Sequence, residues 1–242
     1  MNFTRYLAGG ALAILAASTA LPALAQQMAG TTTGNLRYQL VDLAPDDGID
    51  PWIGLNSYAT LAHAQVYDQD GNEIAGTAIE HFGATGFDNA YASLYAQAQD
   101  NSASVLLTLH SGWGYTGANR SYRFLLSPNT QVVFSVDADL WATPEAPGVS
   151  WPTAIAELWG SLHGATDDQG FSSSFHLEDG VQHGTLSVMA VSQGDWAEGY
   201  LAYDAYAVAE SHALPVPEPQ TSGMLLGGLT VLALLRQRRR SR

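Results

Sequence analysis

The stretch YRFLLSPNTQVVFSVD, residues 122–137, decides the fold class of this chain. Two runs of aromatic, leucine and β-branched residues, 122–127 and 131–137, flank the tetrapeptide Ser-Pro-Asn-Thr at 127–130. Aromatic and β-branched residues favour strands, whereas serine, proline and asparagine favour a turn. We therefore expect two strands joined by a turn at this place in the chain.

Strand patterns of the same kind occur along the sequence. Alternating apolar and polar residues at 35–43 predict a half-buried strand. The segment Gln-Asp-Gly-Asn at 69–72 is typical of a tight turn, and we expect it to join strands at 57–68 and 73–80 into a hairpin. The alanine-rich segment 87–99 alternates like a strand, and we interpret it as one. The other predicted strands are 105–110, 153–163, 170–178, 184–192 and 198–210.

About ten or eleven strands, separated by Gly, Asp, Asn and Pro, predict an all-β domain. No segment of the body shows a helical period over three turns, and no repeat indicates a solenoid or propeller. The pattern predicts an antiparallel β-sandwich, with a jelly roll as a finer alternative that the sequence leaves open. We expect an N-terminal signal peptide before this domain and a single C-terminal hydrophobic helix after it.

The first 25 residues are typical of a secretory signal peptide. Arg5 gives a basic start, an apolar run follows, and small residues form a cleavage site that ends at Ala25. We expect cleavage there, which makes Gln26 the mature N-terminus. The body available for folding is then an acidic domain over residues 26–213.

Residues 214–242 close the chain with three parts in a fixed order. The motif Pro217-Glu218-Pro219 comes first, and an apolar run at 221–235 follows. As a helix, this run rises about 22 Å at ~1.5 Å per residue, which is short of the ~30 Å hydrocarbon core. A temporary membrane anchor therefore suits it better than a permanent one. The last part is a basic cluster that we expect on the cytoplasmic side, formed by Arg236, Arg238, Arg239 and Arg240.

These three parts resemble the PEP-CTERM sorting signal of Gram-negative bacteria. The resemblance implies that an exosortase, a membrane-embedded cysteine transpeptidase, recognises and processes the tail. It also implies a precursor held transiently in the inner membrane, and delivery to the cell surface or to an extracellular matrix associated with exopolysaccharide and biofilm. An ordinary tail anchor is the alternative. Residues 37–53 and 124–138 also resemble uncharacterised bodies of PEP-CTERM proteins, and this resemblance implies no activity.

Charge limits the partners that the body can bind. The chain has a formal net charge of −14, with no lysine and no cysteine. All but one of its 23 acidic residues lie in the predicted body, which holds only three of the nine arginines, Arg37, Arg120 and Arg123. Nucleic acid requires a basic footprint, so we expect no nucleic-acid partner. The absence of cysteine excludes disulfides and thiol chemistry.

Two aspartate-rich loops are candidate calcium sites, because carboxylate and carbonyl oxygens are the ligands that Ca²⁺ prefers. The loop DQDGNE at 68–73 has its glycine at the fourth position and no glutamate at the twelfth, so it is not an EF-hand loop. A plain hairpin turn is the simpler interpretation, and we expect no obligatory cofactor. The candidate ligands are Asp68, Asp70 and Asn72 in this loop, and Asp46, Asp47 and Asp50 in the other.

No motif indicates an enzyme. The seven histidines are scattered, without the i, i+4 spacing of a helical zinc motif, and no Gly-x-Ser-x-Gly elbow is present. A glycosidase needs a pair of carboxylates, but nothing in the sequence distinguishes Glu145, Glu157 or Glu178 as a catalytic acid. We therefore predict no catalytic residues.

The six tryptophans are the remaining candidates for binding. Core packing is the default role of tryptophan, but an exposed aromatic face stacks on a sugar ring. Trp113 and Tyr115 lie among glycines and Trp151 precedes a proline, so these three are the candidate glycan contacts. The sequence favours a non-enzymatic exported surface or matrix protein. The alternative is a carbohydrate-binding module with calcium-stabilised loops.

Overall fold

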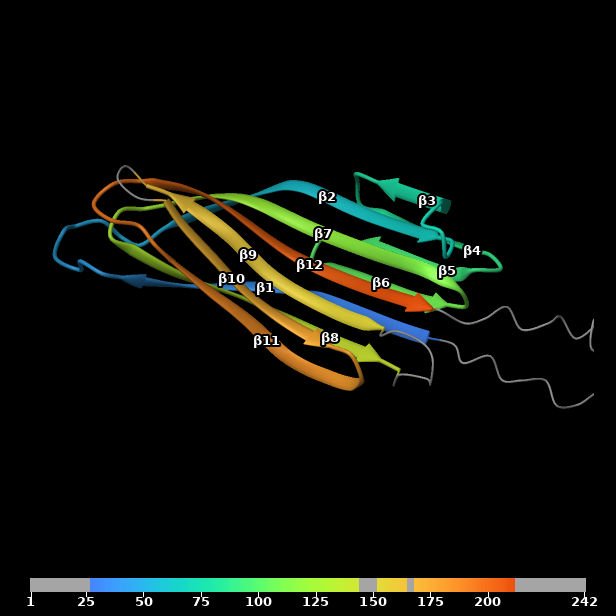
Figure 1. The fold of residues 1–242 in the computed structure, drawn as a ribbon. Helices are drawn as coiled ribbons and strands as arrows, with labels where there is room; N and C mark the ends of the chain where they lie inside the picture. Colours follow the sequence, from blue (N-terminus) through green and yellow to red (C-terminus); the bar gives the residue numbers. More distant parts are fainter. Residues whose placement is uncertain (1–26, 144–151, 165–167, 212–242) are drawn as a thin grey trace, which may run out of the picture. The chain divides into compact units, whose positions relative to one another are not determined.

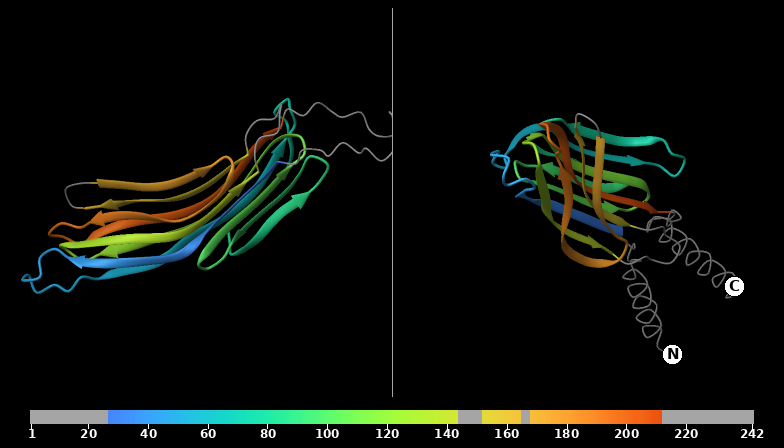
Figure 2. Two further views of the ribbon diagram at one scale, coloured as in Figure 1. Left: turned by 90° about the horizontal axis from the view of Figure 1, so that it is seen from below. Right: turned by 90° about the vertical axis from the view of Figure 1, so that its left-hand side faces the viewer.

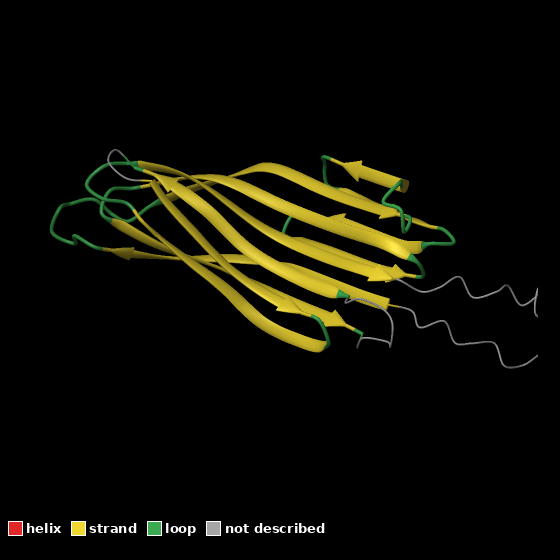
Figure 3. Cartoon of the chain, in the orientation of Figure 1, coloured by secondary structure: helices red, strands yellow, loops and turns green. Residues whose placement is uncertain are grey.

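The computed structural model describes most of the predicted body, and every regular element in the part described is a β-strand (Figure 3). In that part no helix is long and apolar enough to cross a membrane. The residues described are 27–143, 152–164 and 168–211, and all belong to one compact unit within Ala25–Ala213. The predicted signal peptide with its cleavage site at Ala25 and Gln26, the candidate Trp151 and the tail at 214–242 lie outside the described residues.

The strands form two antiparallel six-stranded sheets (Figure 1). Sheet A has the order β11-β8-β1-β6-β5-β4, and sheet B has the order β10-β9-β12-β7-β2-β3. The two layers are seen from two further directions in Figure 2. The strands are β1 (Gln27–Asp42), β2 (Ile53–Tyr67), β3 (Glu73–Ile79), β4 (Gly83–Asp88), β5 (Ala92–Ala98), β6 (Ser102–Leu109), β7 (Gly112–Leu126), β8 (Thr130–Ala142), β9 (Thr153–His163), β10 (Asp168–Leu177), β11 (Gly180–Val191) and β12 (Ala197–Ser211).

The all-β, antiparallel, two-sheet prediction is confirmed. Strands β4, β5 and β6 form a meander, and β1 pairs with both β6 and β8. In sheet B, β12 lies between β9 and β7. Strand β1 contacts β12 across the sandwich, and β6 contacts β7. The central strands of the two sheets therefore enclose the core, and the pairing involves strands that are far apart in the sequence.

The predicted strand at 87–99 is wrong as a single element. Asn89 interrupts it, because its side-chain oxygen accepts hydrogen bonds from the backbone N–H groups of Tyr91 at 2.8 Å and Ala92 at 3.0 Å. This asparagine closes the turn between β4 and β5. Residues Phe87 and Asp88 consequently belong to β4 rather than to β5.

The two turns that we singled out have different roles. The predicted hairpin of β2 and β3 is confirmed as an antiparallel pair. The turn at 127–130 joins β7 of sheet B to β8 of sheet A, so it is a corner between sheets. Ser127 Oγ accepts a hydrogen bond from the Trp52 N–H at 2.7 Å, and the Thr130 N–H donates to Ser192 Oγ at 3.0 Å. Asn129 lies there with φ of 50°, a left-handed conformation that asparagine tolerates.

Both sheets direct large and small apolar side chains into the core. Strand β8 directs Phe134 and Leu140 inwards, whereas β12 directs Ala205 and Ala207 inwards, and all four are buried. Phe134 also contacts Phe124 of sheet B, with ring centroids 5.1 Å apart. Side chains that point away from this core form the two outer faces.

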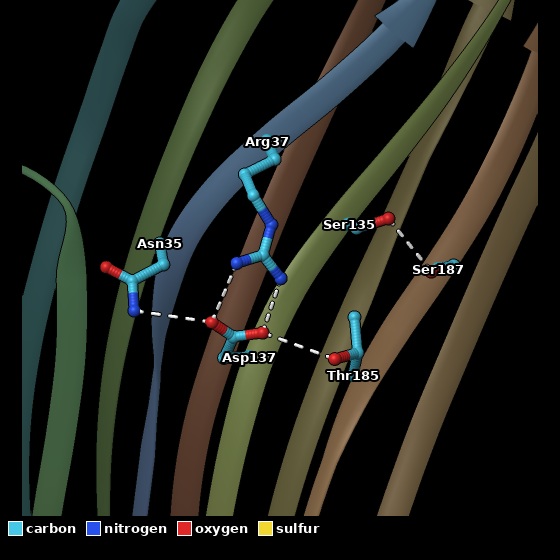
Figure 4. A network of polar contacts seen from close by, with 6 residues as sticks. All are labelled: Asn35, Arg37, Ser135, Asp137, Thr185 and Ser187. Carbon is cyan, nitrogen blue, oxygen red and sulfur yellow. Dashed lines mark hydrogen bonds and ion pairs between the residues drawn. The ribbon is translucent and has the colours of Figure 1, made fainter.

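The outer face of sheet A carries polar groups that bond one another (Figure 4). Arg37 of β1 binds the carboxylate of Asp137 on β8 through both terminal nitrogens, one of them at 3.0 Å. Asn35 and Thr185 donate to the same carboxylate at 3.3 Å and 3.2 Å. The Arg37 side chain is the main reason why the pKa of Asp137 lies below its usual value. These groups therefore satisfy one another's hydrogen-bonding capacity.

Candidate functional site

The first predicted calcium loop forms a turn that is closed by its own aspartate. Asp68 Oδ1 accepts hydrogen bonds from the backbone N–H groups of Asp70 at 2.9 Å and Asn72 at 2.8 Å. The Asn72 side-chain amide also donates to Asp68 Oδ2 at 3.0 Å, and this bond is the main cause that lowers the pKa of Asp68. Gly71 adopts φ of 82°, as a tight turn requires. The geometry is that of a hairpin turn.

The second predicted loop, with Asp46, Asp47 and Asp50, is tied to the inter-sheet corner. Asp47 accepts hydrogen bonds from the Ile49 N–H at 2.8 Å and from the Asn129 side chain at 2.8 Å. Over residues 27–143, 152–164 and 168–211, no group of three or more His, Asp or Glu side chains is placed to hold a metal. Calcium binding by either loop stays a prediction.

The two described glycan candidates, Trp113 and Tyr115, lie together on the outer face of sheet B. Their ring centroids are 5.3 Å apart, and both belong to β7. Tyr67 of β2 packs beside Trp113 at 4.8 Å, and His63 of β2 packs beside Tyr115 at 5.1 Å. All four side chains are partly exposed. These four residues are called the first aromatic cluster below.

A pocket of about 330 Å³ opens beside this cluster. Tyr67 and Trp113 form its aromatic part, and Asp68 and Glu210 lie on its acidic part. The turn of the first predicted calcium loop and Trp113 are therefore neighbours in the fold, although no local sequence pattern connects them. Burial, together with Tyr67 and Glu73, raises the pKa of Tyr115, so its hydroxyl stays protonated at neutral pH. A few polar groups converging on aromatic walls are typical of a small-molecule pocket.

A glycine connects the first cluster to the middle of the sheet. Gly117 of β7 pairs with His63 on one side and with Tyr206 of β12 on the other. A Cβ atom at this position would lie 2.5 Å from His63 Cε1 and 2.8 Å from Tyr206 Cδ1. Both rings therefore cover the glycine, and the aromatic surface continues across β7 without a break.

The centre of the face holds a buried carboxylate, that of Asp204 on β12. Its side chain is only 1% exposed, although it points away from the core. The Asn119 side-chain amide and the Trp159 indole N–H donate to its two oxygens, and the Tyr206 hydroxyl bonds it as well. Burial is the main cause that raises the pKa of Asp204, and the neighbouring Glu157 carboxylate adds to the effect. Burial likewise raises the pKa of Tyr206, whose hydroxyl remains a donor.

A second aromatic cluster lies beyond Asp204. It consists of Trp159, Tyr200 and Tyr58, with Arg123 at its edge. Trp159 contacts Tyr200 with centroids 5.3 Å apart, and Tyr200 contacts Tyr58 at 6.0 Å. The Arg123 guanidinium lies over the Tyr58 ring at 4.2 Å. Trp159 is 38% exposed and Tyr58 is 53% exposed, so this cluster also faces solvent.

This second cluster and Asp204 were not predicted from the sequence. The signal that could have found them is the period of two in β12, which places Tyr200, Asp204 and Tyr206 on one face of the strand. The same period places Glu157 and Trp159 on one face of β9. The sequence gives no local reason to decide that this face points outwards, because Tyr203 on the opposite face is aromatic as well and is fully buried.

Comparison with known proteins identifies the C-terminal segment. The family model of the PEP-CTERM protein-sorting motif matches residues 215–240. The chain carries a PEP-CTERM sorting signal. This confirms the predicted resemblance and marks the chain as an exported protein, and the motif implies processing by an exosortase, a membrane enzyme. The sorting residues themselves, Pro217, Glu218 and Pro219, lie outside the described residues.

The solved structures that were compared are only distantly similar to this chain. One is vicilin from hazelnut, Corylus avellana, with 8% identity, 75% of this chain and 73% of the other covered, and a TM-score of 0.14. Another comes from work on promiscuous carbohydrate-binding modules of the β-sandwich superfamily, with 10% identity, coverage of 75% and 98%, and a TM-score of 0.14. Such low scores support no statement about this chain. The comparison with curated proteins gives no match.

Proposed function

We propose that the protein is a non-enzymatic surface or extracellular-matrix protein that binds glycan through the outer face of sheet B. The first aromatic cluster, which opens onto the pocket beside Trp113, is the observation that carries this proposal. Partly exposed aromatic rings on a sheet face mark a contact surface, because the sandwich core does not need them. The sorting signal supports the proposal, since it directs the domain to the outside of the cell, where polysaccharide is found.

The chemistry of the face favours glycan over other ligands. A sugar ring offers an apolar face for stacking and hydroxyls that donate to carboxylates such as Asp68 and Glu210. Phosphate-bearing ligands would be repelled by the acidic lining and by the net charge of −14. The loops that border the pocket are held by their own hydrogen bonds, so the proposal includes glycan binding without a requirement for calcium.

The sorting signal defines the proposed route to the surface. The precursor is held in the inner membrane by the apolar run at 221–235, with the terminal arginines in the cytoplasm. Exosortase-type processing at the Pro-Glu-Pro motif then releases the domain to the cell surface or to an exopolysaccharide-containing biofilm matrix. Exopolysaccharide is therefore the ligand that the domain meets first.

Retention of the full chain on the producing cell's own polysaccharide tests the proposal. We expect the wild-type protein, purified in mild detergent, to be retained, and Trp113→Ala to lower the affinity by about tenfold, which corresponds to ~1.4 kcal/mol. Trp52→Ala is the matched control, because Trp52 is an exposed tryptophan that contacts Trp196 outside the first cluster. No retention of the wild type, or equal losses in both variants, would refute glycan binding at this site. Release of new reducing ends would refute the non-enzymatic assignment.

A further inference from the structure

We propose that the outer face of sheet B binds an extended, uncharged polysaccharide. The polysaccharide lies across two aromatic platforms, whose relative position is fixed by Asp204. This inference rests on the proposed glycan function and adds the second platform, the ligand class and the binding mode. The first platform is the first aromatic cluster. The second platform is the second aromatic cluster, which no sequence motif singled out.

The two platforms form one continuous strip of aromatic side chains. Each neighbouring pair inside a platform has ring centroids 4.8 Å to 6.0 Å apart. Between the platforms, His63 and Tyr206 both cover Gly117, one from each side, and Tyr206 and Trp159 both bond Asp204. The aromatic strip, as we call it, consists of Tyr67, Trp113, Tyr115, His63, Tyr206, Trp159, Tyr200 and Tyr58.

The length of the strip requires a polymer as its ligand. Trp113 and Arg123 mark its two ends along β7, so at ~3.3 Å per residue the strip extends for about 33 Å. One sugar ring covers a single aromatic side chain, whereas an extended chain spans both platforms at once. Two linked contacts on one ligand raise the apparent affinity, because the second contact forms at a high effective concentration.

Asp204 acts as a positioning residue between the platforms. Only 1% of its side chain is exposed, so it cannot itself contact the ligand. Its bond to the Trp159 indole N–H fixes the plane of that ring, and its bonds to Asn119 and Tyr206 fix the junction with the first platform. A ring that is already oriented loses less freedom on binding. A buried carboxylate is costly to desolvate. Its position on an outer sheet face is explained if it orients the aromatic rings that bind the ligand.

The charges that border the strip select against acidic polysaccharides. Glu73 pairs with Tyr67 and Glu210 pairs with Trp113 in the sheet register, and Glu157 pairs with Asp204. Arg123 is the only arginine that the described residues place on this face. A polymer of uronic acids would meet carboxylate groups along most of its path. An uncharged polymer meets hydrogen-bond acceptors for its hydroxyls instead.

Gly117→Ala provides a test that removes no aromatic ring. The added Cβ would lie 2.5 Å from His63 Cε1 and 2.8 Å from Tyr206 Cδ1, so both rings must move and the strip is interrupted. Gly170→Ala is the matched control, since Gly170 lies on β10 of the same sheet and no atom lies within 4 Å of the added Cβ. Tyr58→Ala removes an exposed ring of the second platform and is the second variant, in case Gly117→Ala fails to fold.

The assay measures binding of the full chain, in mild detergent, to soluble β-1,4-glucan, β-1,3-glucan, galactomannan, xylan and polygalacturonate. We expect an uncharged member to bind best, and its hexasaccharide to bind at least about tenfold more tightly than its disaccharide. Gly117→Ala and Tyr58→Ala should each abolish most of this length dependence. Gly170→Ala should preserve it.

Three results would overturn the inference. They are equal affinity for disaccharide and hexasaccharide, preference for polygalacturonate, and failure to bind any uncharged polymer of the panel. An unchanged length dependence in both Gly117→Ala and Tyr58→Ala would overturn the role of the second platform. In each case the proposed function survives if the producing cell's polysaccharide is still bound in a manner that depends on Trp113, so the two failures are distinguishable.

Discussion

Replacement of the buried Arg120 should separate the contribution of its volume from that of its charge. Arg120 points into the sandwich from β7, and its side chain is 1% exposed. Its guanidinium donates to Ser57 Oγ at 3.2 Å, to the Asp100 backbone carbonyl at 3.1 Å and to the Tyr122 hydroxyl at 3.3 Å. It also lies 4.4 Å from the centroid of the Phe82 ring. The side chain thus fastens the β5–β6 turn and the β3–β4 connection to sheet B.

The expected magnitudes follow from these contacts. Arg120→Ala leaves a cavity and removes three hydrogen bonds, although the Asp100 carbonyl still accepts one from the Tyr122 hydroxyl at 3.3 Å. We expect a loss of about 3–5 kcal/mol in the free energy of unfolding. Arg120→Met keeps most of the volume and removes a buried charge whose desolvation costs several kcal/mol. The Arg120 Nε already lacks a hydrogen-bond partner. We therefore expect Arg120→Met to lie within about 1–2 kcal/mol of the wild type.

Asp100→Asn is the matched control for the ion pair. The Asp100 carboxylate lies 3.6 Å from Arg120 but is 94% exposed, whereas the backbone carbonyl that Arg120 binds is unaffected by the change. We expect a loss below about 1 kcal/mol. Urea unfolding of residues 26–213 gives the free energy of unfolding of all three variants, and an unchanged slope m shows that each variant exposes the same surface on unfolding. If Arg120→Met were as unstable as Arg120→Ala, or Asp100→Asn cost several kcal/mol, the reasoning would be refuted.

Three further predictions concern pH, calcium and sorting. Burial raises the pKa of Asp204 above its ordinary 3.8. The free energy of unfolding of the wild type, relative to that of Asp204→Asn, should therefore be greatest below pH 3.8, fall as pH rises through the raised pKa, and then level off. A difference between the two proteins that does not change with pH would contradict this prediction. Calcium, if bound at a hundredfold excess over its dissociation constant, should stabilise the domain by about 2.7 kcal/mol, and identical melting temperatures in millimolar calcium and in chelator would exclude it. In the native host, Glu218→Ala should leave export intact while unprocessed precursor accumulates, and identical gel mobility of the two forms would favour an ordinary tail anchor.

Local patterns predicted the strands well where the sequence alternates and poorly where polar residues intervene. Strand β9 has the predicted bounds, because apolar and polar residues alternate through it. Strand β1 begins at Gln27, well before the predicted start at residue 35, since its first half is rich in threonine and glycine and is defined by pairing with β6. Asn89 ended a predicted strand through hydrogen bonds that a propensity argument does not contain.

The candidate site was predictable only in part, because it depends on which strands become neighbours. Trp113 and Tyr115 stand close in the sequence and were found by their glycine-rich context. Asp204 and Trp159 are 45 residues apart and meet only because β12 pairs with β9. Single-strand periodicity can assign each of them to a face, but it cannot bring the two faces together.

The position of β12 determines how the domain carries mechanical load. Ser211 ends β12 beside Gly112, and Gln27 begins β1 beside Leu109, so the described chain enters and leaves the sandwich at the same end. In the membrane-held precursor that we propose, tension between the cell and a bound polymer would reach the domain through Ser211, because the apolar run at 221–235 follows it in the chain. Strand β12 is bonded on both sides, to β7 and to β9. These hydrogen bonds run perpendicular to the strand, so a pull along the axis of β12 loads them all together in shear. When an edge strand is peeled away, by contrast, its hydrogen bonds break one after another.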